Sequence, residues 1–129
     1  MSNASIKKKR PVYLNLVQIR QPIPAVISIL HRISGALLFV SGFWLLFLLD
    51  RSLASEAGFD SVRRYTAYPI VKLALLVMIW AYCHHFFAGI RYLFLDLDKG
   101  TDLPAARMTS WITLAVSLAC TAVLGAKLW

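Results

Sequence analysis

A short polar turn, Ser28-Ile29-Leu30-His31-Arg32, opens the first long apolar run of the chain. Ionisable groups beside membrane hydrocarbon are costly unless a ligand, a partner or water takes them up. On a helix, Ser28 and Arg32 are four residues apart and lie on one face, and His31 is three residues from Ser28. The turn therefore presents a hydroxyl and a guanidinium on one face, where both could contact the same ligand, with an imidazole beside them.

Two adjacent imidazoles, His84 and His85, interrupt the second apolar run. Neighbouring side chains on a helix differ by about 100° in direction, so these two do not easily serve one metal. His85 has Ala81 one turn before it and Gly89 one turn after it, which leaves room for a flat macrocycle, whereas His84 has the bulky Trp80. Neutral imidazole is the usual axial ligand of b-type haem. The alternative is that these histidines hydrogen-bond a neighbouring helix.

Each of the other polar groups also has a structural interpretation. Arg32 can be an interfacial arginine whose head group reaches water, and Ser28 can bond the backbone of its own helix. Arg91 and the cluster Lys7–Arg10 can set the orientation of the chain in the membrane and contact lipid head groups, although Arg91 could also reach a haem propionate. No second iron ligand is evident, because His31 is expected at a different level on another helix. A second histidine would have to come from a partner.

The composition indicates a membrane protein of one domain. Of the 129 residues, 59% are hydrophobic, and the mean hydropathy is +0.65, whereas soluble domains are about half apolar. The net charge of +8 could indicate that the protein binds nucleic acid. Here, however, the cations stand beside apolar spans, which favours lipid at the negatively charged cytoplasmic face of a membrane, and no nucleic-acid partner is expected.

Three apolar segments are long enough to cross a bilayer, which needs about 20 apolar residues. The sequence therefore predicts an all-α membrane protein with three transmembrane helices, and the three long uncharged runs disfavour a soluble bundle. We predict a short polar loop between the first two helices, at residues 50–68. The expected boundaries are an amino-terminal segment at 1–21 and a membrane anchor at 22–129, with helices at approximately 24–50, 69–96 and 106–128.

The distribution of Lys and Arg predicts the orientation. Nine of them lie before or at the start of the first helix and in the loop after the second, against five on the other side. The positive-inside rule then puts the amino terminus in the cytoplasm. Because neighbouring helices are expected to be antiparallel, the Ser28–Arg32 turn should share a level with Arg91. His84 and His85 should lie roughly 9–10 Å deeper, at about 1.5 Å per residue.

Two segments together resemble the signatures of a known family, the cytochrome b membrane-anchor subunit of succinate dehydrogenase, respiratory complex II. The resemblance covers nearly the whole chain, and the pair of segments in this order is specific. The first segment comprises Arg10-Pro11, Leu14-Asn15-Leu16, Pro22-Ile23 and Ser28-Ile29-Leu30-His31-Arg32-Ile33-Ser34-Gly35, and the second is His85-Phe86-Phe87-Ala88-Gly89-Ile90-Arg91 followed by Asp96.

The resemblance implies a complex of four subunits in the inner membrane of a bacterium. These are a flavoprotein, an iron–sulfur protein and two membrane anchors, whose helices form a heterodimeric bundle. FAD and the iron–sulfur clusters would belong to the partner subunits, so this chain would be a non-flavin subunit of the oxidoreductase with no succinate-oxidising site of its own.

The same resemblance implies a role for several residues. His85 would be one axial ligand of haem b, with the second supplied by the other anchor. Ser28 and Arg32 would line the ubiquinone site, and His31 and Arg32 would approach the haem propionates. Many members have a histidine directly after the arginine of the second segment, where this chain has Tyr92.

Two other functions are compatible with the sequence. The first is the anchor of a quinol:fumarate reductase, which runs the same reaction backward. The second belongs to a different class, a small non-catalytic membrane accessory protein whose basic tail binds lipid.

Overall fold

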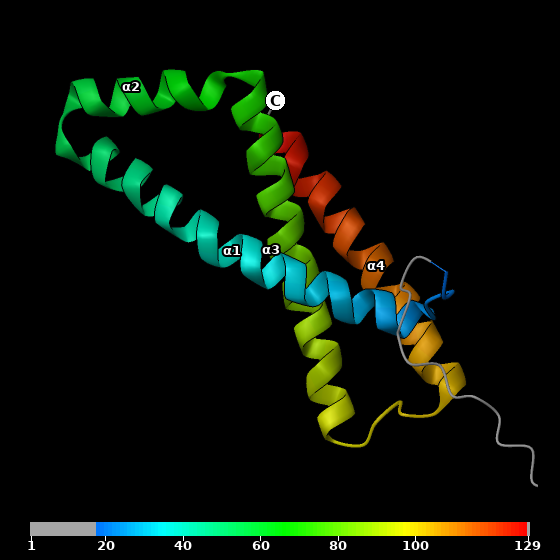
Figure 1. Ribbon diagram of the computed structural model, residues 1–129. Helices are drawn as coiled ribbons and strands as arrows, with labels where there is room; N and C mark the ends of the chain where they lie inside the picture. The colour runs from blue at the N-terminus through cyan, green and yellow to red at the C-terminus, as the bar shows by residue number, and fades with distance from the viewer. Residues whose placement is uncertain (1–17, 129) are drawn as a thin grey trace, which may run out of the picture.

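The computed structural model describes residues 18–128, which form helices joined by short turns (Figure 1). Three of the helices are long and apolar enough to cross a membrane, which confirms the predicted all-α chain with three transmembrane helices. The cluster Lys7–Arg10 and the first part of the amino-terminal signature lie outside the described residues. The elements are α1 (Ile23–Ala54), α2 (Glu56–Ala67), α3 (Pro69–Asp96), α4 (Leu103–Gly125) and the 3-10 helix η1 (Ala126–Leu128).

Proline and capping side chains begin the helices. Each of α1, α3 and α4 has a proline at its first or second position, where the helical N–H has no intrahelical acceptor in any case. At the start of α4, the carboxylate of Asp102 accepts a hydrogen bond from the backbone N–H of Ala105 at 3.2 Å. These local signals explain why the long helices start close to prolines that the sequence displays.

The segment between the first two membrane helices is a helix, so the prediction of a polar loop at residues 50–68 is wrong. Ser55 caps α2 by accepting a hydrogen bond from the backbone N–H of Gly58 at 3.0 Å, and Glu56 lies in the first turn. Both features stabilise a helix N-terminus. Gly58, Val62 and Tyr65 recur at helical spacing and face α1, while α2 connects the separated ends of α1 and α3 (Figure 1).

The contact between α3 and α4 is built on small and hydroxyl-bearing residues. Because each hydroxyl donates to a carbonyl of its own helix three or four residues back, no polar group of the stripe is left unbonded. Such small side chains allow helices to approach closely, and a Cβ added at Gly125 would collide with Leu76 of α3. The buried members of this α4 stripe are Ser110, Thr113, Ser117, Thr121 and Gly125.

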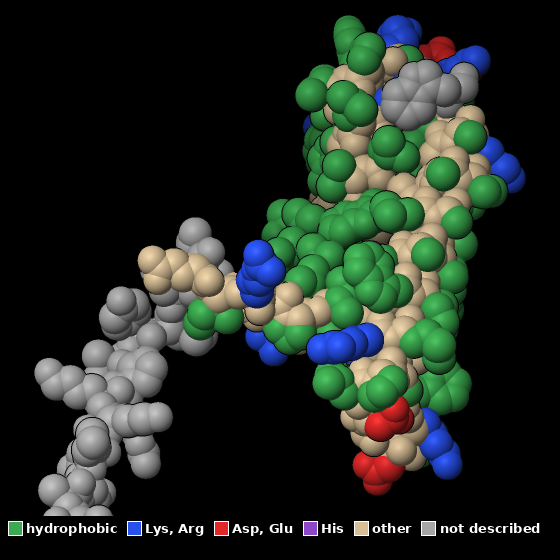
Figure 2. All heavy atoms as spheres, turned by 90° about the vertical axis from the view of Figure 1, so that its right-hand side faces the viewer, with side chains coloured by type: hydrophobic (Ala, Val, Ile, Leu, Met, Phe, Trp, Pro, Cys, Tyr) green, Lys and Arg blue, Asp and Glu red, His purple; other side chains and the backbone are tan. Residues whose placement is uncertain are grey.

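α1 crosses α3 obliquely, so that its two halves have different surroundings (Figure 1). The buried residues of α1, Ile27 and Ser34, lie in its amino-terminal half, whereas Phe39 and Phe43 further along are 71% and 64% exposed. Figure 2 shows a face whose middle is largely hydrophobic, with the visible acidic side chains at its upper and lower ends. This distribution suits a surface that lies in lipid or against another membrane subunit.

Candidate functional site

The crossing of α1 and α3 brings two histidines from separate spans into contact. The rings of His31 and His85 stack with their centroids 4.1 Å apart and their planes within 9°. The prediction that His85 lies roughly 9–10 Å deeper than His31 is therefore wrong. That prediction assumed antiparallel axes, whereas the oblique crossing places the two residues at the same level.

The Nδ1 atom of His85 is held by groups of α1. It lies 3.0 Å from the backbone oxygen of His31 and 3.3 Å from Oγ of Ser34. Since a carbonyl oxygen can only accept, we infer that Nδ1 carries the proton and donates it, which leaves the lone pair on Nε2. Nε2 makes no hydrogen bond with any residue between 18 and 128. In the neutral form of the ring, the site therefore leaves Nε2 as the nitrogen available to a metal.

Gly35 makes this approach of the two helices possible. A Cβ added at Gly35 would lie 2.8 Å from Cε1 and 3.2 Å from Nδ1 of His85. The sequence predicted room for a flat macrocycle at Gly89, which is a separate expectation, and a Cβ added there would make only an ordinary contact, 3.8 Å from Nε2 of His31. The tight position is thus on α1, directly after Ser34. Both residues belong to the first signature, but their own types and spacing predicted no role for either.

His84 has different surroundings from His85. Its side chain is fully buried, and both of its ring nitrogens lack a hydrogen-bond partner within the described chain. Its ring stacks on Trp80, with centroids 5.6 Å apart and planes at 20°. His85, by contrast, is only half-buried. Because His84 is enclosed by its own chain, His85 is the better placed of the two imidazoles to reach a bound group.

Ser28 and Arg32 have side chains available for a ligand. Ser28 is half-buried and Arg32 is exposed. Within residues 18–128, neither side chain makes a hydrogen bond or an ion pair, so the bond that Ser28 could make to its own helix is not present. A hydroxyl donor and a guanidinium therefore lie one helical turn apart on α1, next to the stacked histidines.

Arg91 is bonded to α4, and its guanidinium carbon lies 5.6 Å from the centroid of the Tyr92 ring. It is 7% exposed, and its Nε donates to Oγ1 of Thr109 at 3.1 Å while Nη2 donates to the backbone oxygen of Ala106 at 3.4 Å. Its neighbour Tyr92 instead packs its ring against His31, with centroids 5.1 Å apart. The hydroxyl of Tyr92 is buried without a hydrogen bond in the described part of the chain.

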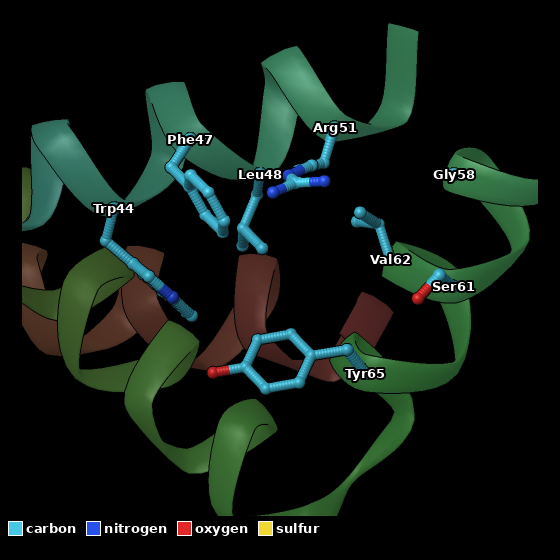
Figure 3. Close-up of a pocket in the computed structure, with 8 residues that line it drawn as sticks. All are labelled: Trp44, Phe47, Leu48, Arg51, Gly58, Ser61, Val62 and Tyr65. Atoms are coloured by element: carbon cyan, nitrogen blue, oxygen red, sulfur yellow. The ribbon is translucent and has the colours of Figure 1, made fainter. Parts of the chain in front are cut away.

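A cavity of about 450 Å³ lies elsewhere, between the carboxyl-terminal half of α1 and α2. It contains none of the residues expected to do chemistry. In Figure 3 the guanidinium of Arg51 lies near the ring of Phe47, and the distance from Cζ to the ring centroid is 5.3 Å. The residues that line this cavity are Trp44, Phe47, Leu48, Arg51, Gly58, Ser61, Val62 and Tyr65.

Most of the chain is similar to known membrane subunits. Residues 6–124 match the family described as succinate dehydrogenase/fumarate reductase transmembrane subunit. The succinate dehydrogenase cytochrome b556 subunit of Coxiella burnetii is 35% identical over 122 residues, covering 94% of this chain and 98% of the relative. The proteins of the same name from Rickettsia typhi and Paracoccus denitrificans are 31% and 28% identical, covering 92% and 84% of this chain and 93% and 84% of theirs.

Proposed function

The chain belongs to the succinate dehydrogenase/fumarate reductase transmembrane subunit family, and on this premise we propose that it binds haem b and helps form a ubiquinone-reduction site. It is a cytochrome b membrane subunit of succinate dehydrogenase, as its relatives are named. The observation that carries the proposal is the His85 ring, whose Nδ1 is bonded to α1 and whose Nε2 is left with a lone pair.

His85 is the proposed axial ligand in this chain. A haem-ligating histidine commonly donates its second ring N–H to a backbone carbonyl, which fixes the tautomer and the ring orientation. The His31 carbonyl does this here, and Gly35 leaves the space that the ring occupies. When bound, haem b would supply a one-electron centre.

The second axial ligand is proposed to come from the other membrane anchor. His31 would not be the second ligand, because the His31 and His85 rings stack face to face, with centroids 4.1 Å apart and planes within 9°. Two rings in that arrangement cannot both direct a nitrogen at one iron. The haem is therefore proposed to lie between this chain and a second anchor subunit.

Ser28 and Arg32 are the proposed quinone-binding residues. The Ser28 hydroxyl donates to a carbonyl oxygen of ubiquinone, and the Arg32 guanidinium stabilises the negative charge that develops there during reduction. Reduction to the quinol takes two electrons, which arrive through the iron–sulfur subunit, and two protons from the cytoplasm. Succinate is oxidised on the flavoprotein, which holds FAD, so this chain needs no succinate site.

Groups near the haem propionates form the third part of the proposal. His31 and Arg32 are on the same turn of α1 as the contact to His85, which supports their assignment to the propionates. Arg91 remains a predicted propionate contact, although its guanidinium bonds to α4 through Thr109. The chain is a multi-pass membrane protein, and we propose that it lies in a bacterial inner membrane with a cytoplasmic amino terminus.

Substitution of Arg32 tests the quinone assignment. In the purified complex, Arg32→Leu should abolish ubiquinone reduction by succinate while succinate oxidation with a soluble acceptor continues. Arg107→Leu is the matched control, since Arg107 is an exposed arginine of α4. Quinone reductase activity that is unchanged in Arg32→Leu contradicts the assignment, because the complex would then reduce ubiquinone without the guanidinium.

Two measurements separate the alternatives. The ratio of succinate oxidation to fumarate reduction distinguishes a succinate dehydrogenase from a quinol:fumarate reductase, and the names of the relatives favour the former. A reduced-minus-oxidised spectrum of the purified membrane complex distinguishes either of them from a non-catalytic accessory protein, which would show no haem band.

A further inference from the structure

Ser34 is a fully buried serine on α1 whose hydroxyl reaches the proposed haem ligand on α3. We propose that Ser34 is a positioning residue for His85, holding the ring in the orientation and tautomer that iron ligation requires. This inference rests on the proposed function, since it assumes that His85 binds the iron. It adds a residue whose side chain acts through the ligand and does not itself touch the haem iron.

The hydrogen bonds determine the direction in which Ser34 acts. Its hydroxyl donates to the backbone oxygen of His31 at 2.9 Å, so the proton of Oγ is already directed away from the His85 ring. Oγ of Ser34 lies 3.3 Å from Nδ1 of His85, so a remaining lone pair of Oγ can accept from Nδ1–H. Nδ1 also donates to the backbone oxygen of His31, at 3.0 Å. The Nδ1–H group thus has two acceptors, and neither of them can donate to it.

The His85 ring is held on several sides. The ring of His31 stacks against one face at 4.1 Å, and Ser34 with the His31 carbonyl secures the Nδ1 edge. At Gly35 the space is so small that an added Cβ would lie 2.8 Å from Cε1. Rotation of the ring about its bond to Cβ would break both hydrogen bonds to Nδ1. Because Ser34 is fully buried, water has no access to replace its oxygen.

The polarity of this contact has a consequence for the iron. Acceptors on the second ring N–H raise the basicity of a ligating histidine. A more basic imidazole favours the ferric over the ferrous state. Loss of the Ser34 oxygen should therefore make the haem easier to reduce, while the His31 carbonyl keeps the tautomer.

Ser117 provides a matched control within the same chain. It is also fully buried, and its hydroxyl donates to the backbone oxygen of Thr113 at 2.6 Å, one turn earlier on α4. Its hydroxyl has no contact with an imidazole. Ser34→Ala and Ser117→Ala therefore both remove a buried hydroxyl from a helix, but only Ser34→Ala removes an acceptor from His85.

The experiment uses the complete purified complex with haem bound. We expect Ser34→Ala to raise the haem midpoint potential, by no more than about the 59 mV that corresponds to a tenfold change in a one-electron equilibrium. We also expect an altered low-spin ferric electron paramagnetic resonance signal, which reports ring orientation. Ser34→Thr, which keeps the hydroxyl, should restore both properties, and Ser117→Ala should leave both unchanged.

The outcomes separate the two proposals. A wild-type potential and resonance signal in Ser34→Ala, or equal changes in Ser117→Ala, overturn the role of Ser34. If Ser34→Ala does not assemble, Ser34→Cys replaces it, because sulfur is a much weaker acceptor than the serine oxygen, and a wild-type potential in that variant also overturns the role. If replacement of His85 leaves haem bound with its original spectrum, the ligand assignment itself fails, whatever Ser34 does.

Discussion

Replacement of Gly35 by alanine tests the approach of α1 to α3 more directly than any other substitution. The added Cβ would lie 2.8 Å from Cε1 of His85, so the ring must move by about 0.6 Å to reach the 3.4 Å at which ordinary contact begins. The same Cβ would lie 3.2 Å from Nδ1. A shift of this size lengthens or misaligns the 3.0 Å hydrogen bond from Nδ1 to the His31 carbonyl, and hydrogen bonds weaken steeply when misaligned.

Gly42, on the same helix, supplies the control, because nothing lies within 4 Å of a Cβ added there. Both Gly→Ala substitutions gain about 0.5–1 kcal/mol from the better helix propensity of alanine. Only Gly35→Ala also introduces overpacking, which typically costs about 1–3 kcal/mol. We therefore expect Gly35→Ala to be less stable than Gly42→Ala by about 1–3 kcal/mol, and to bind less haem.

The assay compares haem per complex, the reduced-minus-oxidised spectrum and the thermal unfolding temperature of the two purified variants. Gly42→Ala should match or exceed the wild-type unfolding temperature and keep the full haem content. Full haem content with an unchanged spectrum and unfolding temperature in Gly35→Ala would show that His85 does not pack against Gly35. The arrangement of the site described above would then be wrong.

Two further predictions concern the neighbouring side chains. His85→Phe should remove the haem band, whereas His84→Phe should keep it. Both ring nitrogens of His84 are buried without partners in the described chain, so an apolar ring of similar shape loses no hydrogen bond. Loss of the band in His84→Phe alone would move the ligand to that position. Thr109→Val leaves Nε of the buried Arg91 without its acceptor and should lower stability by about 1–3 kcal/mol. Thr113→Val, which removes a hydroxyl bonded only to its own helix, should cost less in the same unfolding measurement, and equal losses would contradict the importance of the contact to Arg91.

The sequence alone was sufficient for the architecture of the membrane spans and for the family. Three apolar runs of bilayer length predict three crossing helices, and the structure has helices of that kind in those places. Because apolar length is a property of consecutive residues, no tertiary information is needed to recognise it. The helix α2 shows the limit of this reasoning. Its Ser55 cap and Glu56 were visible in the sequence, but a segment of low apolar content was interpreted as a loop.

The candidate site was only partly accessible from the sequence. Spacing along α1 places Ser28 and Arg32 on one face without reference to any other helix. The contact of His31 with His85 depends instead on the angle at which α1 crosses α3, and crossing angles arise from the packing of side chains between helices. The bond from His85 Nδ1 joins residues 54 positions apart in the chain. The tertiary structure alone could therefore reveal that Ser34, Gly35 and a backbone carbonyl of α1 hold the histidine of α3.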